Sequence, residues 1–182
     1  GQIQGFFDMP VDNLFTTPLF ARYIKKKLKS KKLICVSPDV GGVQRTRGLA
    51  TKIKADLAII DKRRPKPGKS QVMNIIGNVK GKTCIIVDDI IDSGGTIINA
   101  VDALKKNGAT DVYVFITHAV LSGDAANKIK KSKIKKLIIT DSIDNSHKIK
   151  NNNKIEVLSV SSLMAEAIKR ISNSTSVSDL FN

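Results

Sequence analysis

The sequence predicts a doubly wound α/β fold, in which a mainly parallel sheet carries helices on both faces. Three observations predict it: short apolar runs alternate with helical segments, the runs are continuously apolar, and polar residues directly follow several of the apolar runs. Continuous apolar runs indicate strands buried on both faces, and the alternation implies right-handed crossovers between parallel strands. The length suits one domain, residues 1–182, with ligands at the carboxyl ends of the strands.

Six segments are predicted to be strands because each is a short run rich in Ile, Val and Leu. They are residues 33–36, 57–60, 83–87, 112–116, 137–140 and 155–160. Cys35 and Cys84 lie inside two of these runs. Two free, buried thiols in a reducing compartment are therefore expected in place of a disulfide.

Five segments between the strands are predicted to be helices. They are residues 17–29, 43–53, 96–107, 122–131 and 161–171. Thr17 is expected to cap the first helix with Pro18 in its first turn, and Gly108 is expected to end the third helix. Two stretches are predicted to be loops, the basic residues 62–71 and the polar residues 144–154.

The chain is strongly basic, with a formal net charge of +15. Much of the excess lies in residues 25–32 and 128–136, which we interpret as solvated helix faces and turns, although the charge would also attract polyphosphate substrates. No nucleic-acid partner is expected, because aromatic residues do not interleave the lysines. The apolar runs are too short to span a bilayer and the first residues do not resemble a signal peptide, so a cytoplasmic location without a membrane partner is expected.

The most informative segment, residues 85–96, joins an apolar strand, two adjacent aspartates and a small-residue loop that opens a helix. Small residues let backbone N–H groups approach a phosphate, and the helix N-terminus adds a favourable dipole. The two aspartates suit the hydroxyls of a sugar whose phosphate sits in this loop. A capped turn with surface acids is the alternative. The residues expected to bind the sugar phosphate are Asp88, Asp89, Asp92, Ser93, Gly94, Gly95 and Thr96.

A second loop, residues 37–42, also joins a predicted strand to a predicted helix, and that helix carries Arg45 and Arg47 in its first turns. Its paired glycines permit close backbone approach, and Asp39 offers a carboxylate to Mg²⁺ or to a metal-bound water. A strand-to-helix turn without a ligand is the alternative. The basic stretch from residue 62 would place fixed positive charge against a polyphosphate, or would simply be an exposed loop.

Residues 85–96 resemble the phosphoribosyl pyrophosphate signature that type I phosphoribosyltransferases share with ribose-phosphate pyrophosphokinases. Further blocks occur in the same order as in the pyrophosphokinase family. They are residues 5–14, 36–42, 61–65, 72–74, 157–160 and 176–181. The chain therefore resembles that family over almost its whole length, and the fold that this implies is of the type I phosphoribosyltransferase kind. One departure is Gly94, which stands where many members carry a larger residue and which is expected to be harmless.

The resemblance implies an enzyme that transfers the diphosphoryl group of ATP to ribose 5-phosphate, giving phosphoribosyl pyrophosphate and AMP, with Mg²⁺ as cofactor. It implies that Lys62 and Arg64 are catalytic and that Asp39 supports the metal. The residues implied to surround the transferred pyrophosphate are Asp39, Val40, Gly41 and Gly42.

The resemblance also implies a preceding domain of similar fold, with much of the adenine site and a metal-binding His. The chain alone is therefore expected to bind ribose 5-phosphate but to be weakly active or inactive, and the intact enzyme to be a hexamer built from dimers. The chain ends are implied to form an allosteric site for phosphate or ADP, although a frayed terminus is an equal alternative. The residues of that site are Gln2, Gln4, Asp12, Ser176, Ser178 and Phe181.

Two other functions stay open at this point. A phosphoribosyltransferase acting on a base would need a hood over the base, and no segment suggests one. A non-catalytic regulatory subunit or an RNA-binding regulator on the same fold would use the high positive charge. The presence of Lys62, Arg64, Asp88 and Asp89 disfavours a non-catalytic copy.

Overall fold

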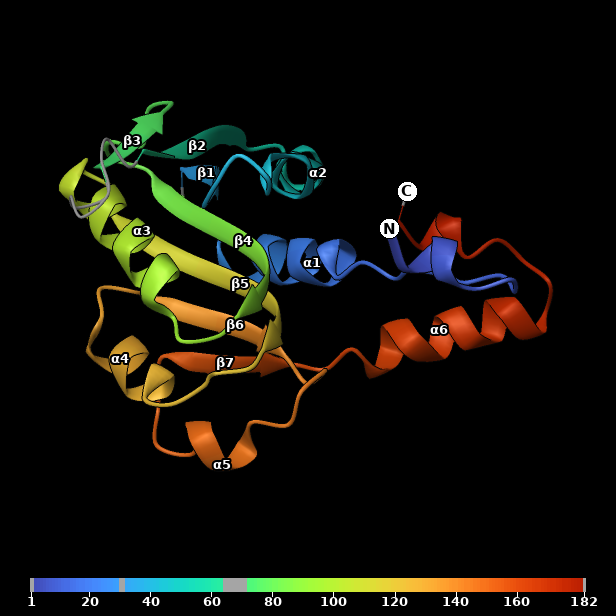
Figure 1. Ribbon diagram of the computed structural model, residues 1–182. Coiled ribbons are helices and arrows are strands. Elements are labelled where there is room, and N and C mark those ends of the chain that lie inside the picture. The colour runs from blue at the N-terminus through green and yellow to red at the C-terminus, as the bar shows by residue number, and fades with distance from the viewer. Residues whose placement is uncertain (1, 30–31, 64–71, 182) are drawn as a thin grey trace.

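The computed structural model describes residues 2–29, 32–63 and 72–181. Its centre is a sheet of seven strands in the order β3-β2-β1-β4-β5-β6-β7 (Figure 1). The strands are β1 (Leu33–Ser37), β2 (Asp56–Arg63), β3 (Val72–Ile76), β4 (Thr83–Ile91), β5 (Asp111–Ala119), β6 (Lys136–Thr140) and β7 (Ile155–Leu158). All neighbours pair in parallel except β3, which runs antiparallel to β2 at one edge.

Helices connect the parallel strands and cover both faces of the sheet. The helices are α1 (Thr17–Lys27), α2 (Val43–Ile53), α3 (Gly95–Lys106), α4 (Ala125–Lys131), α5 (Ser146–Ile149) and α6 (Ser161–Ser172), with short 3-10 helices η1 (Gln2–Phe6) and η2 (Ser178–Leu180) near the chain ends. None of the described helices is long and apolar enough to cross a membrane. The predicted fold, a doubly wound and mainly parallel sheet, is confirmed.

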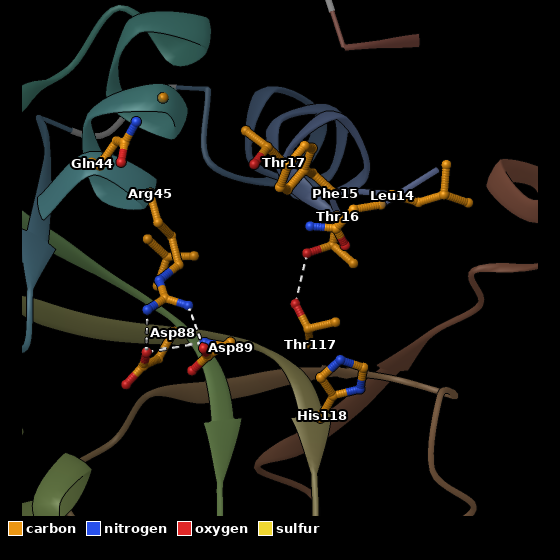
Figure 2. Close-up of a pocket in the computed structure, with 13 residues that line it drawn as sticks. Leu14, Phe15, Thr16, Thr17, Gln44, Arg45, Asp88, Asp89, Thr117 and His118 are labelled. Atoms are coloured by element: carbon orange, nitrogen blue, oxygen red, sulfur yellow. Dashed lines mark hydrogen bonds and ion pairs between the residues drawn. The ribbon is translucent and has the colours of Figure 1, made fainter. Parts of the chain in front are cut away.

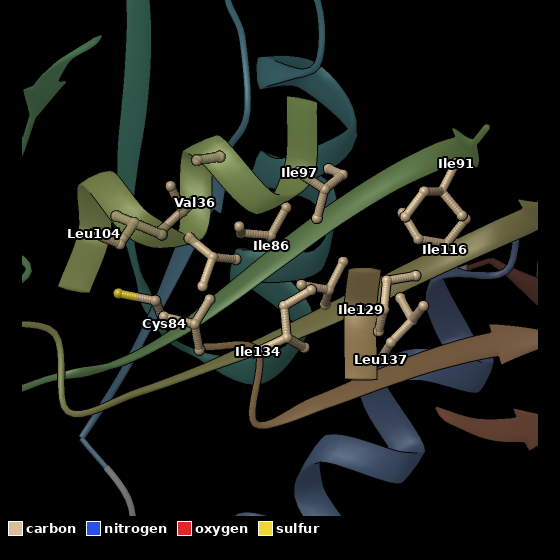
Figure 3. Packing of buried hydrophobic residues seen from close by; sticks show 14 of the residues in the cluster. Val36, Cys84, Ile86, Ile91, Ile97, Leu104, Ile116, Ile129, Ile134 and Leu137 are labelled. Atoms are coloured by element: carbon tan, nitrogen blue, oxygen red, sulfur yellow. The ribbon is translucent and has the colours of Figure 1, made fainter. Parts of the chain in front are cut away.

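Two hydrophobic clusters, one on each face, hold the layers together. On β4, Cys84 and Ile86 belong to the cluster that α3 and α4 cover (Figure 3), whereas Ile85 and Val87 belong to the cluster under α1 and α2. Alternate side chains of a strand point to opposite faces, so a continuously apolar run supplies both clusters. Cys35 and Cys84 are buried and unbonded, as predicted, and burial raises the pKa of each thiol to about 12.

Several predicted boundaries are wrong. The strand predicted at residues 83–87 continues through both aspartates to Ile91, because β4 stays paired with β5 as far as Ala119. The helix predicted at residues 122–131 begins only at Ala125, after Gly123 at φ +55°. At α1 the capping position is Thr16 rather than Thr17, and it makes no side-chain cap.

Two predicted loops contain regular structure. The basic stretch begins inside β2, which runs to Arg63, and is followed by β3; residues 64–71 lie outside the described part of the chain. The polar stretch 144–154 contains the single-turn helix α5. The predicted stop of α3 at Gly108 is confirmed, since this residue follows the C-cap Asn107 at φ +84°.

Candidate functional site

The order of the sheet reverses between β1 and β4. From β1 the sheet continues through β2 and β3 on one side, whereas β4 and all later strands lie on the other. β1 and β4 are parallel, with Val36 opposite Ile86. In open α/β sheets, ligands bind beside such a switch point at the carboxyl ends of the strands. The two predicted loops, residues 38–42 and 92–94, follow these two strands and therefore lie at this point of the sheet.

The loop after β1 is tied into a compact turn. The Ser37 hydroxyl donates to the Asp39 carbonyl at 2.6 Å, and the Gly42 amide donates to Asp39 Oδ1 at 2.8 Å. A Cβ at Gly42 would come within 2.9 Å of the Ser37 hydroxyl oxygen, so a larger residue here would displace that hydroxyl and its hydrogen bond to Asp39. Asp39 and Val40 are exposed. One carboxylate oxygen of Asp39 thus fixes the turn, while the side chain faces solvent.

Arg45, from α2, binds both aspartates of β4 (Figure 2). Its Nη2 lies 3.3 Å from Asp88 Oδ1, and its Nη1 lies 2.8 Å from Asp89 Oδ2. The Asp89 amide donates to Asp88 Oδ1 at 3.0 Å. The sequence placed Arg45 in the first turns of its helix without linking it to these acids, because the two segments are joined only by the β1–β4 pairing.

The two carboxyls titrate differently. Burial raises the pKa of Asp88 to about 6, although the Asp89 amide and the Arg45 charge act in the opposite direction. Burial also tends to raise the pKa of Asp89, but the hydrogen bond and charge of Arg45 outweigh it, so that pKa is lowered. The Asp88 side chain is 18% exposed and that of Asp89 is 59% exposed, which accounts for the difference in desolvation.

The loop after β4 leads directly into α3 and suits an anion. Gly94, at φ +78°, is the N-cap of α3, and it has no side chain that could cap the helix. No side-chain hydrogen bond therefore caps the first-turn N–H groups of α3. Uncapped N–H groups at a helix start bind phosphate readily. Ser93 and Thr96 are exposed, and their hydroxyls are accessible beside the loop. An anion is therefore the kind of ligand that this helix start suits.

A pocket of about 670 Å³ opens beside the aspartates. Its lining comes from the segment before α1, from α2, from β4 and from the end of β5, where Thr117 and His118 lie (Figure 2). The Thr16 and Thr117 hydroxyls are 2.8 Å apart, and His118 Nδ1 lies 3.0 Å from the Ser142 hydroxyl. The sequence did not link Thr16, Thr117 or His118 to the aspartates, because that relation depends on the pairing of β4 with β5 and on the position of the segment before α1.

The remaining predicted residues lie in two places. Lys62 lies in β2, where it pairs with Met73 of β3. Ser37, the last residue of β1, is opposite Ile59, so Lys62 lies three residues further along, toward the carboxyl ends of the strands where the two loops lie. Arg64 lies outside the described residues. At the chain ends, the Phe15 and Phe181 rings contact each other edge to face, with centroids 5.4 Å apart.

The other residues predicted for the terminal site are mostly exposed. Gln4 donates to the Val11 carbonyl at 3.0 Å, while Asp12, Ser176 and Ser178 face solvent. Gln2 begins η1, and its side chain lies outside the described part. α6 extends away from the sheet (Figure 1), and Arg170 of α6 lies 3.7 Å from Asp179 near the C-terminus. A regulatory role for these residues stays a prediction.

Comparison with known proteins identifies the family. A model of the phosphoribosyl synthetase-associated domain matches residues 37–182. The chain belongs to this phosphoribosyl synthetase family. It is 56% identical over 182 residues to the ribose-phosphate pyrophosphokinase of Bradyrhizobium diazoefficiens, covering 100% of this chain and 57% of that protein. It is 53% identical over 182 residues to that of Rhizobium meliloti, covering 100% of this chain and 59% of the relative.

A solved member of the phosphoribosyl synthetase family confirms the fold. The crystal structure of phosphoribosylpyrophosphate synthetase from Mycobacterium smegmatis superposes with a TM-score of 0.86 and 37% identity, over 95% of this chain and 56% of that one. The chain thus corresponds to the C-terminal region of such enzymes and spans less than two thirds of their length.

Proposed function

We propose that this chain is the phosphate-binding, catalytic part of a ribose-phosphate diphosphokinase. The observation that carries the proposal is an uncapped, glycine-containing helix start directly after a strand whose last residues present two carboxylates. Ribose 5-phosphate carries the two kinds of group that this arrangement suits, an anion at one end and hydroxyls at the other. Membership of the phosphoribosyl synthetase family and identity above 50% to ribose-phosphate pyrophosphokinases support this assignment.

In the proposed reaction the anomeric hydroxyl of ribose 5-phosphate attacks the β-phosphorus of ATP, and the bond to AMP breaks. Asp88 and Asp89 accept hydrogen bonds from the ribose hydroxyls, while residues 92–96 hold the 5′-phosphate. Residues 39–42 surround the transferred diphosphoryl group. Lys62 and Arg64 stabilise the charge that develops on it, so that positioning and electrostatics supply most of the rate.

Mg²⁺ fits this site in the way it commonly binds with polyphosphates. No group of three or more His, Cys, Asp or Glu side chains within the described ranges is arranged to hold a metal. Mg²⁺ usually takes one or two carboxylates and completes its shell with water and substrate phosphates. The exposed carboxylate of Asp39 matches this mode. The bound ion would neutralise charge on the triphosphate, while Asp39 would keep it at the loop.

The rest of the enzyme and its assembly are part of the same proposal. Because the relatives are much longer than this chain, the remaining portion is proposed to supply the adenine site, and the assembled enzyme to be a homo-oligomeric hexamer built from dimers. Exposed apolar residues on α6, Met164, Ile168 and Ile171, support a face that is covered in the assembly. The two buried, unbonded cysteines suit the cytoplasm.

Calorimetry with ribose 5-phosphate on this chain tests the proposal. We expect saturable binding to the wild-type chain and loss of most of it in Asp89→Asn. A coupled assay for AMP release should show little turnover until the remaining portion of the enzyme is supplied. The absence of ribose 5-phosphate binding at millimolar ligand would contradict the assignment.

A further inference from the structure

We propose that Arg45 is a positioning residue for ribose recognition, which holds Asp88 and Asp89 together as one acceptor pair for two sugar hydroxyls. The inference rests on the proposed function and extends it to a residue outside the two signature loops. It starts from the two ion pairs that Arg45 makes with neighbouring carboxylates of one strand.

The guanidinium spans the two acids in a way that leaves acceptors for a ligand. Each terminal nitrogen of Arg45 binds one oxygen of a different aspartate, Asp88 Oδ1 and Asp89 Oδ2. The planar fork of an arginine fixes the distance between two such oxygens, which the single ammonium of a lysine does not. The second oxygen of each carboxylate is outside these two ion pairs. In the proposed role, these two oxygens accept hydrogen bonds from two neighbouring hydroxyls of the ribose ring.

This geometry is not the one that stability alone would favour. Within the described residues, Arg45 Nε is buried without a hydrogen-bond partner. A buried, unsatisfied donor costs about 1–3 kcal/mol. Asp88 is also desolvated, and its partial burial works against its charge. Features that reduce stability and meet at one pocket are typical of functional sites.

Charge gives a second reason for Arg45 beside this pair. Ribose 5-phosphate brings close to two negative charges at neutral pH. The two aspartates add further negative charge, and the lowered pKa of the exposed Asp89 favours its ionised form. A cation on the carboxylates reduces their repulsion of the rest of the substrate while they accept hydroxyls. Arg45 supplies that charge from α2, on the wall of the same pocket.

The experiment compares three ligands on four versions of this chain. The ligands are ribose 5-phosphate, 2-deoxyribose 5-phosphate and inorganic phosphate, all measured by calorimetry. The proteins are the wild type, Arg45→Met, Arg45→Lys and the control Arg47→Met, which removes an exposed arginine from the same helix. Circular dichroism and a thermal melt accompany each variant, so that loss of fold is seen directly.

We expect Arg45→Met to raise the Kd for ribose 5-phosphate about tenfold, which is about 1.4 kcal/mol. The preference of the wild type for ribose over 2-deoxyribose should shrink in the same variant. Binding of inorganic phosphate should change less than about twofold at physiological salt, because only a screened charge is lost. Arg45→Lys should recover part of the affinity but not the sugar preference, and Arg47→Met should behave as the wild type.

The outcomes distinguish a failure of the proposed function from a failure of the proposed role of Arg45. If the wild-type chain binds none of the ligands, the proposed function itself is wrong. If it binds ribose 5-phosphate and prefers it to the 2-deoxy sugar, but Arg45→Met binds equally or more tightly, the positioning role is wrong and the function stands. Equal losses for ribose 5-phosphate and inorganic phosphate would also overturn the role, since they would show damage to the whole site.

Discussion

Replacement of Asp88 by asparagine should stabilise the fold above pH 6 while it weakens ribose 5-phosphate binding. The pKa of Asp88 is raised from 3.8 to about 6, chiefly by burial. The folded chain therefore holds a proton that the unfolded chain has already released, and unfolding stability falls as pH rises from about 4 to about 6. Asparagine keeps the size of the side chain without this titration.

The size of the effect follows from the two pKa values. A rise from 3.8 to about 6 corresponds to about 3 kcal/mol, at about 1.4 kcal/mol per pH unit. The attraction of Arg45 for the carboxylate is already contained in that pKa, because it lowers the value that burial raises. Between pH 4.5 and pH 8 this shift lowers the stability of the wild type by about 2 kcal/mol, so we expect Asp88→Asn to gain about 2 kcal/mol of unfolding free energy relative to the wild type over that range. Urea denaturation of both proteins at the two pH values measures this.

Asp89→Asn provides a control of opposite sign. The pKa of Asp89 is lowered, so its ionised form stabilises the fold at neutral pH, and asparagine should lose stability there. Both variants should bind ribose 5-phosphate less tightly than the wild type. The reasoning is refuted if the stability difference between Asp88→Asn and the wild type is the same at pH 4.5 and at pH 8.

Three further predictions follow from the loops and the chain ends. Lys62→Ala combined with Arg64→Ala, in the enzyme assembled with its remaining portion, should cut kcat roughly a hundredfold with little change in KM; an unchanged kcat with a raised KM would mean that the pair only binds substrate. Gly94→Ala should lower the free energy of unfolding, measured by urea denaturation, by about 1 kcal/mol. The loss would come from backbone strain at φ +78°, because an added Cβ would have its nearest neighbouring atom at 3.8 Å and so would not clash. An unchanged free energy of unfolding would contradict the strain argument. In the same assembled enzyme, titrated with phosphate and ADP, Ser176→Ala with Ser178→Ala should shift the midpoints of the proposed activation by phosphate and inhibition by ADP; unchanged midpoints would show that the C-terminal tail has no regulatory role.

The central strands could be predicted from the sequence because their burial on both faces makes them continuously apolar. The strand from Leu33, for example, contributes Cys35 to one cluster and Val36 to the other. β3 could not be found in this way, because it is an edge strand whose residues alternate between partly buried Met73 and exposed Asn74. The C-terminal end of β4 was underestimated because pairing with β5 carries the strand through two aspartates that have low strand propensity.

In the candidate site, too, the local features could be predicted and the contacts between distant segments could not. The two loops could be predicted because all their residues are contiguous and the chemistry of each loop is local. Arg45 and Thr117 could not, since their relation to Asp88 depends on which strands are neighbours and on how far β4 and β5 extend. A pattern in one segment indicates what that segment binds, but it does not indicate which distant side chain completes it.

The acidic pair shows why this distinction matters for function. Two adjacent aspartates on an exposed turn would both be ionised and independent, and they would contribute little to specificity. On β4 they differ in burial, so burial raises the pKa of Asp88 while Arg45 lowers that of Asp89. The cation that fixes their geometry comes from the helix after the other signature loop. At the β1–β4 switch point, the ion pairs of Arg45 therefore connect the helix after one loop to the strand before the other. A substitution at Arg45 in α2 should for this reason alter the site where the ribose hydroxyls are proposed to bind.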